Sequence, residues 1–149
     1  MAINRTISIL GGGCAGYSLT KELSKINGID INFYLGTDNI KDNYWGFWKN
    51  RNDSFHFPIH AKWDRWKISD WNNEVDFESR ESPYCIVKRS EWYDFCKNET
   101  SSKSVKFIRE NIDENHGIYY RKNGEPIKSD YIFDCRTKTL EDEVYKQQF

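Results

Sequence analysis

The sequence predicts an α/β fold built on a parallel sheet, and three observations support this prediction. A short apolar run at residues 6–10 ends in glycines, as a buried parallel strand does. A helical stripe of apolar residues follows over residues 15–26 and stops at Asn27-Gly28. A second apolar run at residues 30–35 completes a βαβ unit, whose two strands should be parallel with a right-handed crossover.

The first helix should pack on the sheet through Leu19, Leu23 and Ile26, which recur at helical spacing. A second helix is predicted at residues 90–97, with Ser90 as its N-cap. Further strands are predicted at residues 55–59, 66–68, 84–88, 105–109, 117–121 and 131–134. We expect the last three strands to form a small β meander or to return to the main sheet, with a turn at residues 122–124 between the last two.

Length and composition favour one cytoplasmic domain, residues 1–149. A net charge of −1 creates no field that would gather nucleic acid or an anionic membrane. No apolar run is long enough for a signal peptide or an integral membrane segment. Four cysteines form no C-x-x-C pair, which predicts reduced thiols. His56 and His60 lack a third ligand, and Pro58 breaks any helix between them, so we expect no metal site.

Gly11, Gly13 and Gly16 fill the pattern G-x-G-x-x-G between the first strand and the first helix, which is the context that a dinucleotide-binding turn requires. The first glycine permits the tight turn, the second lets the backbone approach a pyrophosphate, and the third packs the helix on the strand. The N–H groups of Cys14 and Ala15 should face the phosphates at the positive end of the helix.

The acidic partner of the ribose hydroxyls is expected at the end of the second strand. Gly36 stands at about that position, and the nearest acid is Asp38, two residues later. Either Asp38 binds the ribose or this contact is missing.

Aromatic residues make up 16% of the chain and gather in residues 39–88, which we interpret as an aromatic-rich insertion. Trp45, Trp48, Trp63 and Trp66 lie in it. They could form a flat apolar wall for a substrate or a flavin ring, or a small aromatic core that replaces scarce aliphatic residues.

The order of several motifs resembles the lycopene cyclase family of flavoproteins. The stretch YWGF at residues 44–47 is similar to that family's aromatic T-W-S-F motif, and residues 58–68 are similar to its P-x(4)-W-D-x-Y-x-V pattern. The stretch YIFDCRTK at residues 131–138 resembles its V-F-D-S-R-P motif, with Asp134 and Arg136 kept.

This resemblance implies a Rossmann-like FAD-binding domain of the glutathione-reductase type, with residues 39–88 corresponding to part of a substrate domain. It implies FAD as the cofactor, Arg89 as a further cofactor-binding residue and a polyene or carotenoid substrate. Members of the family are far longer, so the resemblance covers their N-terminal part and accounts for binding of the ADP half of FAD. Asp64, Asp70, Glu74 and Glu78 are candidate acids for cyclisation by composition alone, and solvated loop carboxylates are the alternative.

The favoured function is therefore a short lycopene-cyclase-like flavoprotein that binds FAD through its glycine turn and is incomplete alone. Two alternatives stay open. One is another flavin-dependent enzyme, of the halogenase or monooxygenase type. The other is a non-catalytic nucleotide-fold module or subunit that needs a completing protein chain or a second copy of itself.

Overall fold

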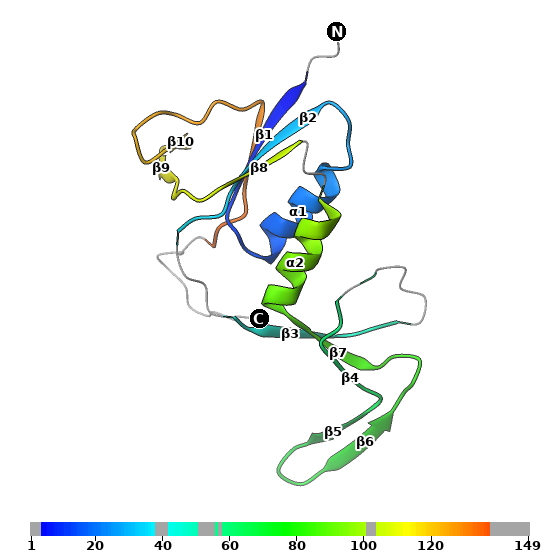
Figure 1. The fold of residues 1–149 in the computed structure, drawn as a ribbon. Coiled ribbons are helices and arrows are strands. Elements are labelled where there is room, and N and C mark those ends of the chain that lie inside the picture. The colour runs from blue at the N-terminus through cyan, green and yellow to red at the C-terminus, as the bar shows by residue number, and fades with distance from the viewer. Residues whose placement is uncertain (1–3, 38–41, 51–55, 57, 101–103, 138–149) are drawn as a thin grey trace. The chain divides into compact units, whose positions relative to one another are not determined.

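The structure is a computed structural model that describes residues 4–37, 42–50, 56, 58–100 and 104–137 (Figure 1). It divides into two compact units. The first unit comprises residues 1–40 and 96–148, and the second comprises residues 41–95 and 149. Asp38 lies outside the described residues.

The first unit is built on a four-stranded sheet in which every neighbouring pair is parallel, in the order β11-β1-β2-β8. Its strands are β1 (Arg5–Leu10), β2 (Ile29–Tyr34), β8 (Val105–Ile108) and β11 (Tyr131–Asp134). This arrangement confirms the predicted parallel βαβ unit. It also shows that the segments at 105–109 and 131–134 return to the main sheet, one at each edge.

Helix α1 (Cys14–Leu23) ends before Ile26, which is 50% exposed, while the other two predicted packing residues, Leu19 and Leu23, are half-buried. The buried residues of the helix are Gly16, Tyr17 and Thr20. The Tyr17 ring meets the Phe33 ring of β2 edge-on at 5.0 Å between centroids. The prediction missed these contacts because it counted only aliphatic residues, whereas the smallest residue, Gly16, permits the closest approach to the sheet.

A two-stranded hairpin, β9 (Asp113–Asn115) and β10 (Ile118–Tyr120), accompanies the main sheet. His116 and Gly117 connect its strands with positive φ angles of 51° and 78°, as a two-residue type I′ turn requires. After β10 the predicted turn at 122–124 forms, but it leads to an isolated bridge between Tyr120 and Pro126 and not directly to β11. The meander is therefore separate from β11.

The second unit contains a three-stranded antiparallel sheet in the order β3-β7-β4 and a separate hairpin. The sheet strands are β3 (Tyr44–Trp48), β7 (Tyr84–Lys88) and β4 (Ala61–Trp63), and the hairpin strands are β5 (Arg65–Ser69) and β6 (Glu74–Glu78). The predicted strands at 84–88 and 66–68 correspond to β7 and β5. The strand predicted at 55–59 is not observed at 56, 58 and 59, and its other residues lie outside the described part.

Helix α2 (Arg89–Glu99) follows β7 directly and confirms the predicted second helix. Ser90 does not act as its N-cap, because it lies inside the helix. Instead, the carboxylate of Asp42 accepts hydrogen bonds from the backbone N–H of Ser90 at 3.1 Å and from its hydroxyl at 2.8 Å. An acidic side chain in this position also interacts favourably with the positive end of the helix.

Candidate nucleotide-binding site

The glycine turn lies at the carboxyl end of the parallel sheet, between β1 and α1. Gly11 continues the sheet, because its N–H donates to the Tyr34 carbonyl at 2.8 Å, and it then takes a φ of +106°. A Cβ atom at Gly11 would lie 3.0 Å from Cγ of Arg136 and 3.1 Å from its backbone nitrogen. Both the backbone angle and the available space therefore require glycine at this position.

Gly16 is the point at which α1 comes closest to the strands. A Cβ atom here would lie 2.1 Å from the Gly11 carbonyl oxygen and 3.0 Å from Cε2 of Phe33. No side chain fits in that space without moving backbone atoms. The third glycine thus has the packing role that the sequence pattern predicts.

Gly13 differs from the other two, because a Cβ atom built on it would meet no atom of the described residues within 4 Å. It is the N-cap of α1 and its backbone is extended, and among the residues that the structure describes no side chain caps the helix. Cys14 and Ala15 follow as exposed residues in the first helical turn. Open space beside an uncapped helix N-terminus is the arrangement in which backbone N–H groups bind phosphate oxygens.

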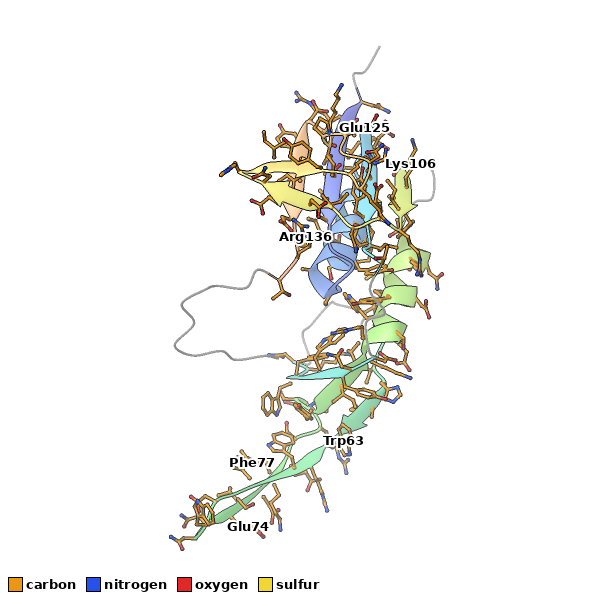
Figure 2. All side chains as sticks on the ribbon, turned by 90° about the vertical axis from the view of Figure 1, so that its left-hand side faces the viewer. Trp63, Glu74, Phe77, Lys106, Glu125 and Arg136 are labelled. Carbon is orange, nitrogen blue, oxygen red and sulfur yellow. The ribbon has the colours of Figure 1, made fainter. Side chains whose placement is uncertain are left out.

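Arg136, labelled in Figure 2, packs against Gly11, the first residue of the turn. Its guanidinium donates to both carboxylate oxygens of Asp134, at 2.9 Å each, and also to the Ile112 carbonyl. The guanidinium lies 5.8 Å from the centroid of the Tyr119 ring. The motif resemblance selected Asp134 and Arg136 without giving them a role, and the structure shows that the pair connects β11, the glycine turn and the hairpin β9–β10.

We expect Arg136→Lys to lower the free energy of unfolding by about 2 kcal/mol, because lysine cannot form the two parallel hydrogen bonds to Asp134. Urea denaturation followed by circular dichroism measures this change. Arg5→Lys is the matched control, since Arg5 forms an exposed ion pair with Asp130 at 3.7 Å and its replacement should cost less than about 1 kcal/mol. Equal losses of unfolding free energy in the two variants would contradict the conclusion that Arg136 holds β11, the glycine turn and the hairpin together.

A hollow of about 630 Å³ lies where β2 and β8 end. Strand β2 is the sheet neighbour of β1, which the glycine turn follows. Thr37 and Asn111 hold its two sides together, because the Thr37 N–H donates to Oδ1 of Asn111 at 2.8 Å. Glu110 and Arg121 pair within it at 3.0 Å, and the hydrogen bond from Arg121 lowers the pKa of Glu110. Sequence reasoning did not find this hollow, since it depends on residues about 75 positions apart.

The second unit carries the remaining predicted site residues. Arg89 begins α2. Trp48 and Trp63 stand opposite Tyr84 in the strand register and flank its ring, at centroid distances of 5.1 and 6.3 Å. Trp66 extends this group through Trp48, at 6.4 Å. Trp48 and Trp63 are 59% and 46% exposed, so the group is an open aromatic surface.

Trp45 does not belong to this surface. Successive residues of a strand point to opposite faces, and Trp45 is three positions before Trp48, so the two side chains leave β3 on opposite sides. Trp45 instead meets Trp92 of α2 edge-on at 6.1 Å, and Trp92 is buried. The structure therefore separates the four tryptophans into one packing residue and three surface residues.

The four candidate acids lie in the second unit. Backbone N–H groups of Asn72 and Asn73 lower the pKa of Asp70, which is opposite to the shift that a proton donor to an alkene needs. Glu74 pairs with Lys67, and Glu78 pairs with Arg65 at 2.9 Å, both on the hairpin β5–β6 that carries the labelled Glu74 and Phe77 in Figure 2. Asp64 pairs with Lys62 at 3.4 Å.

Within the described part of the chain, no group of three or more histidine, cysteine, aspartate or glutamate side chains could hold a metal ion. The helices in that part include none that is both long and apolar enough to span a membrane.

Several solved structures resemble this chain. A tetrameric 2-methyl-3-hydroxypyridine-5-carboxylic acid oxygenase matches with a TM-score of 0.57 and 19% identity, over 87% of this chain and 38% of its own. CtdE in complex with FAD matches with a TM-score of 0.53 and 13% identity, over 88% of this chain and 38% of the CtdE chain. A tryptophan C-6 flavin-dependent halogenase (chlorinase) from taromycin biosynthesis matches with a TM-score of 0.52 and 11% identity, over 89% of this chain and 42% of the halogenase chain.

At these identities the likeness shows the fold alone, which is the Rossmann-type fold of FAD-binding flavoproteins. The chain spans less than half the length of each of these three structures. No protein-family model and no curated protein matches the sequence. None of the three structures is a lycopene cyclase, so the likeness supports the halogenase or monooxygenase alternative better than the favoured expectation.

Proposed function

We propose that this chain is the nucleotide-binding part of an FAD-dependent enzyme of the monooxygenase or halogenase type. The observation that carries the proposal is the distribution of space around the three glycines. Side-chain atoms would clash at Gly11 and Gly16, where the turn and the packing need glycine, whereas a Cβ atom at Gly13 would meet no atom within 4 Å in the described part of the chain. That difference is expected if the space beside Gly13 is kept for a ligand.

In this proposal the backbone N–H groups of Cys14 and Ala15 bind the diphosphate of FAD at the N-terminus of α1. The adenosine end extends toward the hollow at the ends of β2 and β8, where Thr37 and Asn111 lie. Asp38 is retained as the candidate partner of the ribose, and Arg89 as a candidate cofactor-binding residue. When bound, FAD would supply the redox chemistry.

The aromatic surface of Trp48, Trp63, Trp66 and Tyr84 supports a flat, apolar substrate. The similar structures include an oxygenase named for a hydroxypyridine carboxylic acid and a halogenase named for tryptophan. We therefore favour an aromatic substrate over a polyene. Cyclisation of a carotenoid, as the motif resemblance implies, is the second candidate, and conversion of lycopene by the flavin-loaded protein would favour it.

Equilibrium titration of the purified chain with FAD, followed by flavin fluorescence, tests the proposal. We expect saturable binding, because the turn and the uncapped helix N-terminus are already in place, and we expect ADP to compete for the site. FAD binding that ADP cannot displace would contradict the assigned site. Failure to bind FAD at high micromolar concentration would favour a non-catalytic module, or one that requires a completing chain.

The alkylation rates of the four cysteines provide an independent test of whether FAD occupies the glycine turn. Cys14 is exposed in the first turn of α1, whereas Cys85 and Cys96 are buried, and burial raises the pKa of the Cys96 thiol to about 11. At pH 7.5 we expect iodoacetamide to label Cys14 first and Cys96 last, as measured by peptide mass spectrometry. Saturating FAD should slow the labelling of Cys14 at least about fivefold because the diphosphate covers it. Unchanged labelling in the presence of bound FAD would place the cofactor elsewhere.

A further inference from the structure

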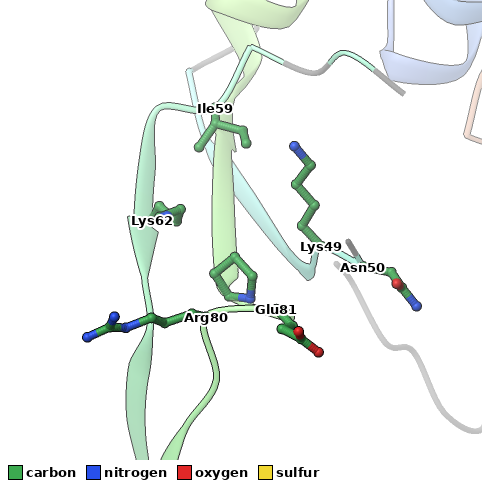
Figure 3. Close-up of a pocket in the computed structure, with 7 residues that line it drawn as sticks. Lys49, Asn50, Ile59, Lys62, Arg80 and Glu81 are labelled. Carbon is green, nitrogen blue, oxygen red and sulfur yellow. The ribbon is translucent and has the colours of Figure 1, made fainter. Parts of the chain in front are cut away.

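A second hollow, of about 480 Å³, lies at one end of the sheet β3-β7-β4 in the second unit (Figure 3). The residues that line it lie directly after β3, before and within β4, and in the loop before β7. The lining residues are Lys49, Asn50, Ile59, Lys62, Arg80, Glu81 and Pro83. The volume is within the range of small-molecule sites in proteins.

Two lysines reach this hollow from opposite sides of β7. Lys62 of β4 stands directly opposite Cys85, and Phe47 of β3 stands opposite Cys85 on the other side. Lys49 is two positions after Phe47, and its N–H donates to the Pro83 carbonyl at 3.0 Å, so the antiparallel ladder continues to Lys49. Because side chains alternate along a strand, Lys49, Lys62 and Cys85 share one face of the sheet.

The positive charges of both lysines act on the same buried thiol. Burial raises the pKa of Cys85, the charges of Lys49 and Lys62 oppose that rise, and the charge of Asp64 adds to it. Lys62 also pairs with Asp64, but at 3.4 Å between side chains that are 51% and 39% exposed, such a pair is weak. Figure 3 shows Arg80 and Glu81 pointing away to opposite sides. The lining has more positive side chains (Lys49, Lys62 and Arg80) than negative ones (Glu81), so its net charge is positive.

The rest of the lining is partly apolar. Pro83 is buried and Ile59 is half-buried, and both line the same space as the two lysines. An inorganic anion would satisfy the lysines and leave this apolar surface exposed to water, whereas an anion attached to an apolar group would cover it as well.

We propose that this hollow is a binding site for a small organic carboxylate, with the carboxylate between Lys49 and Lys62 and its apolar part against Ile59 and Pro83. This site is separate from the glycine turn and does not depend on binding of FAD. It gives the second unit a ligand of its own, on the face of the sheet opposite to the aromatic surface of Trp48, Tyr84 and Trp63.

Isothermal titration of the full chain with 1-naphthoate tests this proposal, with 1-naphthalenemethanol and inorganic phosphate as comparison ligands. We expect saturable binding of naphthoate, and at least tenfold weaker binding of the neutral alcohol and of phosphate. Lys49→Gln and Lys62→Gln should each weaken naphthoate binding at least fivefold. Lys67→Gln removes one positive charge from the same unit but outside the hollow, and it should change the affinity less than twofold.

Three results would overturn the proposal. One is the absence of saturable naphthoate binding to the folded chain, and another is an equal loss of affinity in Lys67→Gln and in the two hollow variants. Phosphate binding as tight as naphthoate would also contradict it, since the apolar part of the site would then contribute nothing. FAD titration of Lys49→Gln/Lys62→Gln provides the second readout, and unchanged FAD affinity is expected because the two sites are independent.

Discussion

Replacing Gly13 by alanine is expected to weaken FAD binding at least about tenfold while lowering the free energy of unfolding by no more than about 1 kcal/mol. The added methyl group meets no atom within 4 Å among the residues whose positions the structure describes, and the backbone at Gly13 is one that any residue adopts. The small stability cost reflects the lower preference for alanine at a helix N-cap. The methyl group instead occupies the space through which a diphosphate would approach the backbone N–H groups of α1.

Fluorescence titration with FAD and urea denaturation, performed on the same protein preparation, separate these two effects. Gly28→Ala is the control for stability, because its positive φ of 79° strains alanine while the position directly precedes β2, at the end of the sheet opposite to the glycine turn. It should lose stability and keep its FAD affinity. If Gly13→Ala binds FAD as tightly as the parent chain, the open space at Gly13 is not the diphosphate site and the proposed function loses its main support.

The βαβ unit could be predicted from the sequence because its signals are local. The apolar run before the glycines, the glycine spacing and the second apolar run all lie within residues 5–34, and the structure places β1 and β2 in parallel register as expected. The face of α1 could not be predicted in this way. It is set by the contact of Gly16 with the Gly11 carbonyl and by Tyr17 against Phe33, and counting apolar residues gives no weight to a glycine.

The strands of the second unit were harder to predict for a different reason. Strand prediction expects apolar residues to alternate with polar ones, with the apolar residues buried. In β3 every side chain except that of Gly46 is aromatic, and Tyr44 and Trp48 are exposed, so no alternation marks the strand. Gly46 itself is needed because the Tyr84 phenol lies over it, with a Cβ position only 2.0 Å from the hydroxyl oxygen.

The sequence indicated the position of the candidate site but not what supports it. The three glycines follow a known pattern, so their roles could be assigned in advance. The support from Arg136 depends on its contacts with the Ile112 carbonyl, 24 residues earlier, and with Gly11, 125 residues earlier. Such contacts leave no local signal, and only the motif resemblance drew attention to Asp134 and Arg136.

Replacing Gly16 by alanine should have the opposite outcome to the change at Gly13, because the same methyl group would enter filled space. Its carbon would lie 2.1 Å from the Gly11 carbonyl oxygen, which belongs to the backbone and cannot rotate away. Either α1 moves off the sheet or the turn opens, and both changes disrupt the contact of Tyr17 with Phe33. We expect a loss of at least about 3 kcal/mol in the free energy of unfolding.

Urea denaturation monitored by circular dichroism measures this loss, with Gly13→Ala as a matched control that adds one methyl group three residues away. The two variants together test whether the turn has one function or two. Stability lost only at Gly16 and FAD affinity lost at Gly13 without loss of fold would assign packing to one glycine and ligand approach to the other. A Gly16→Ala chain as stable as Gly13→Ala would contradict the close approach of α1 to β1, and the description of the site would fail with it.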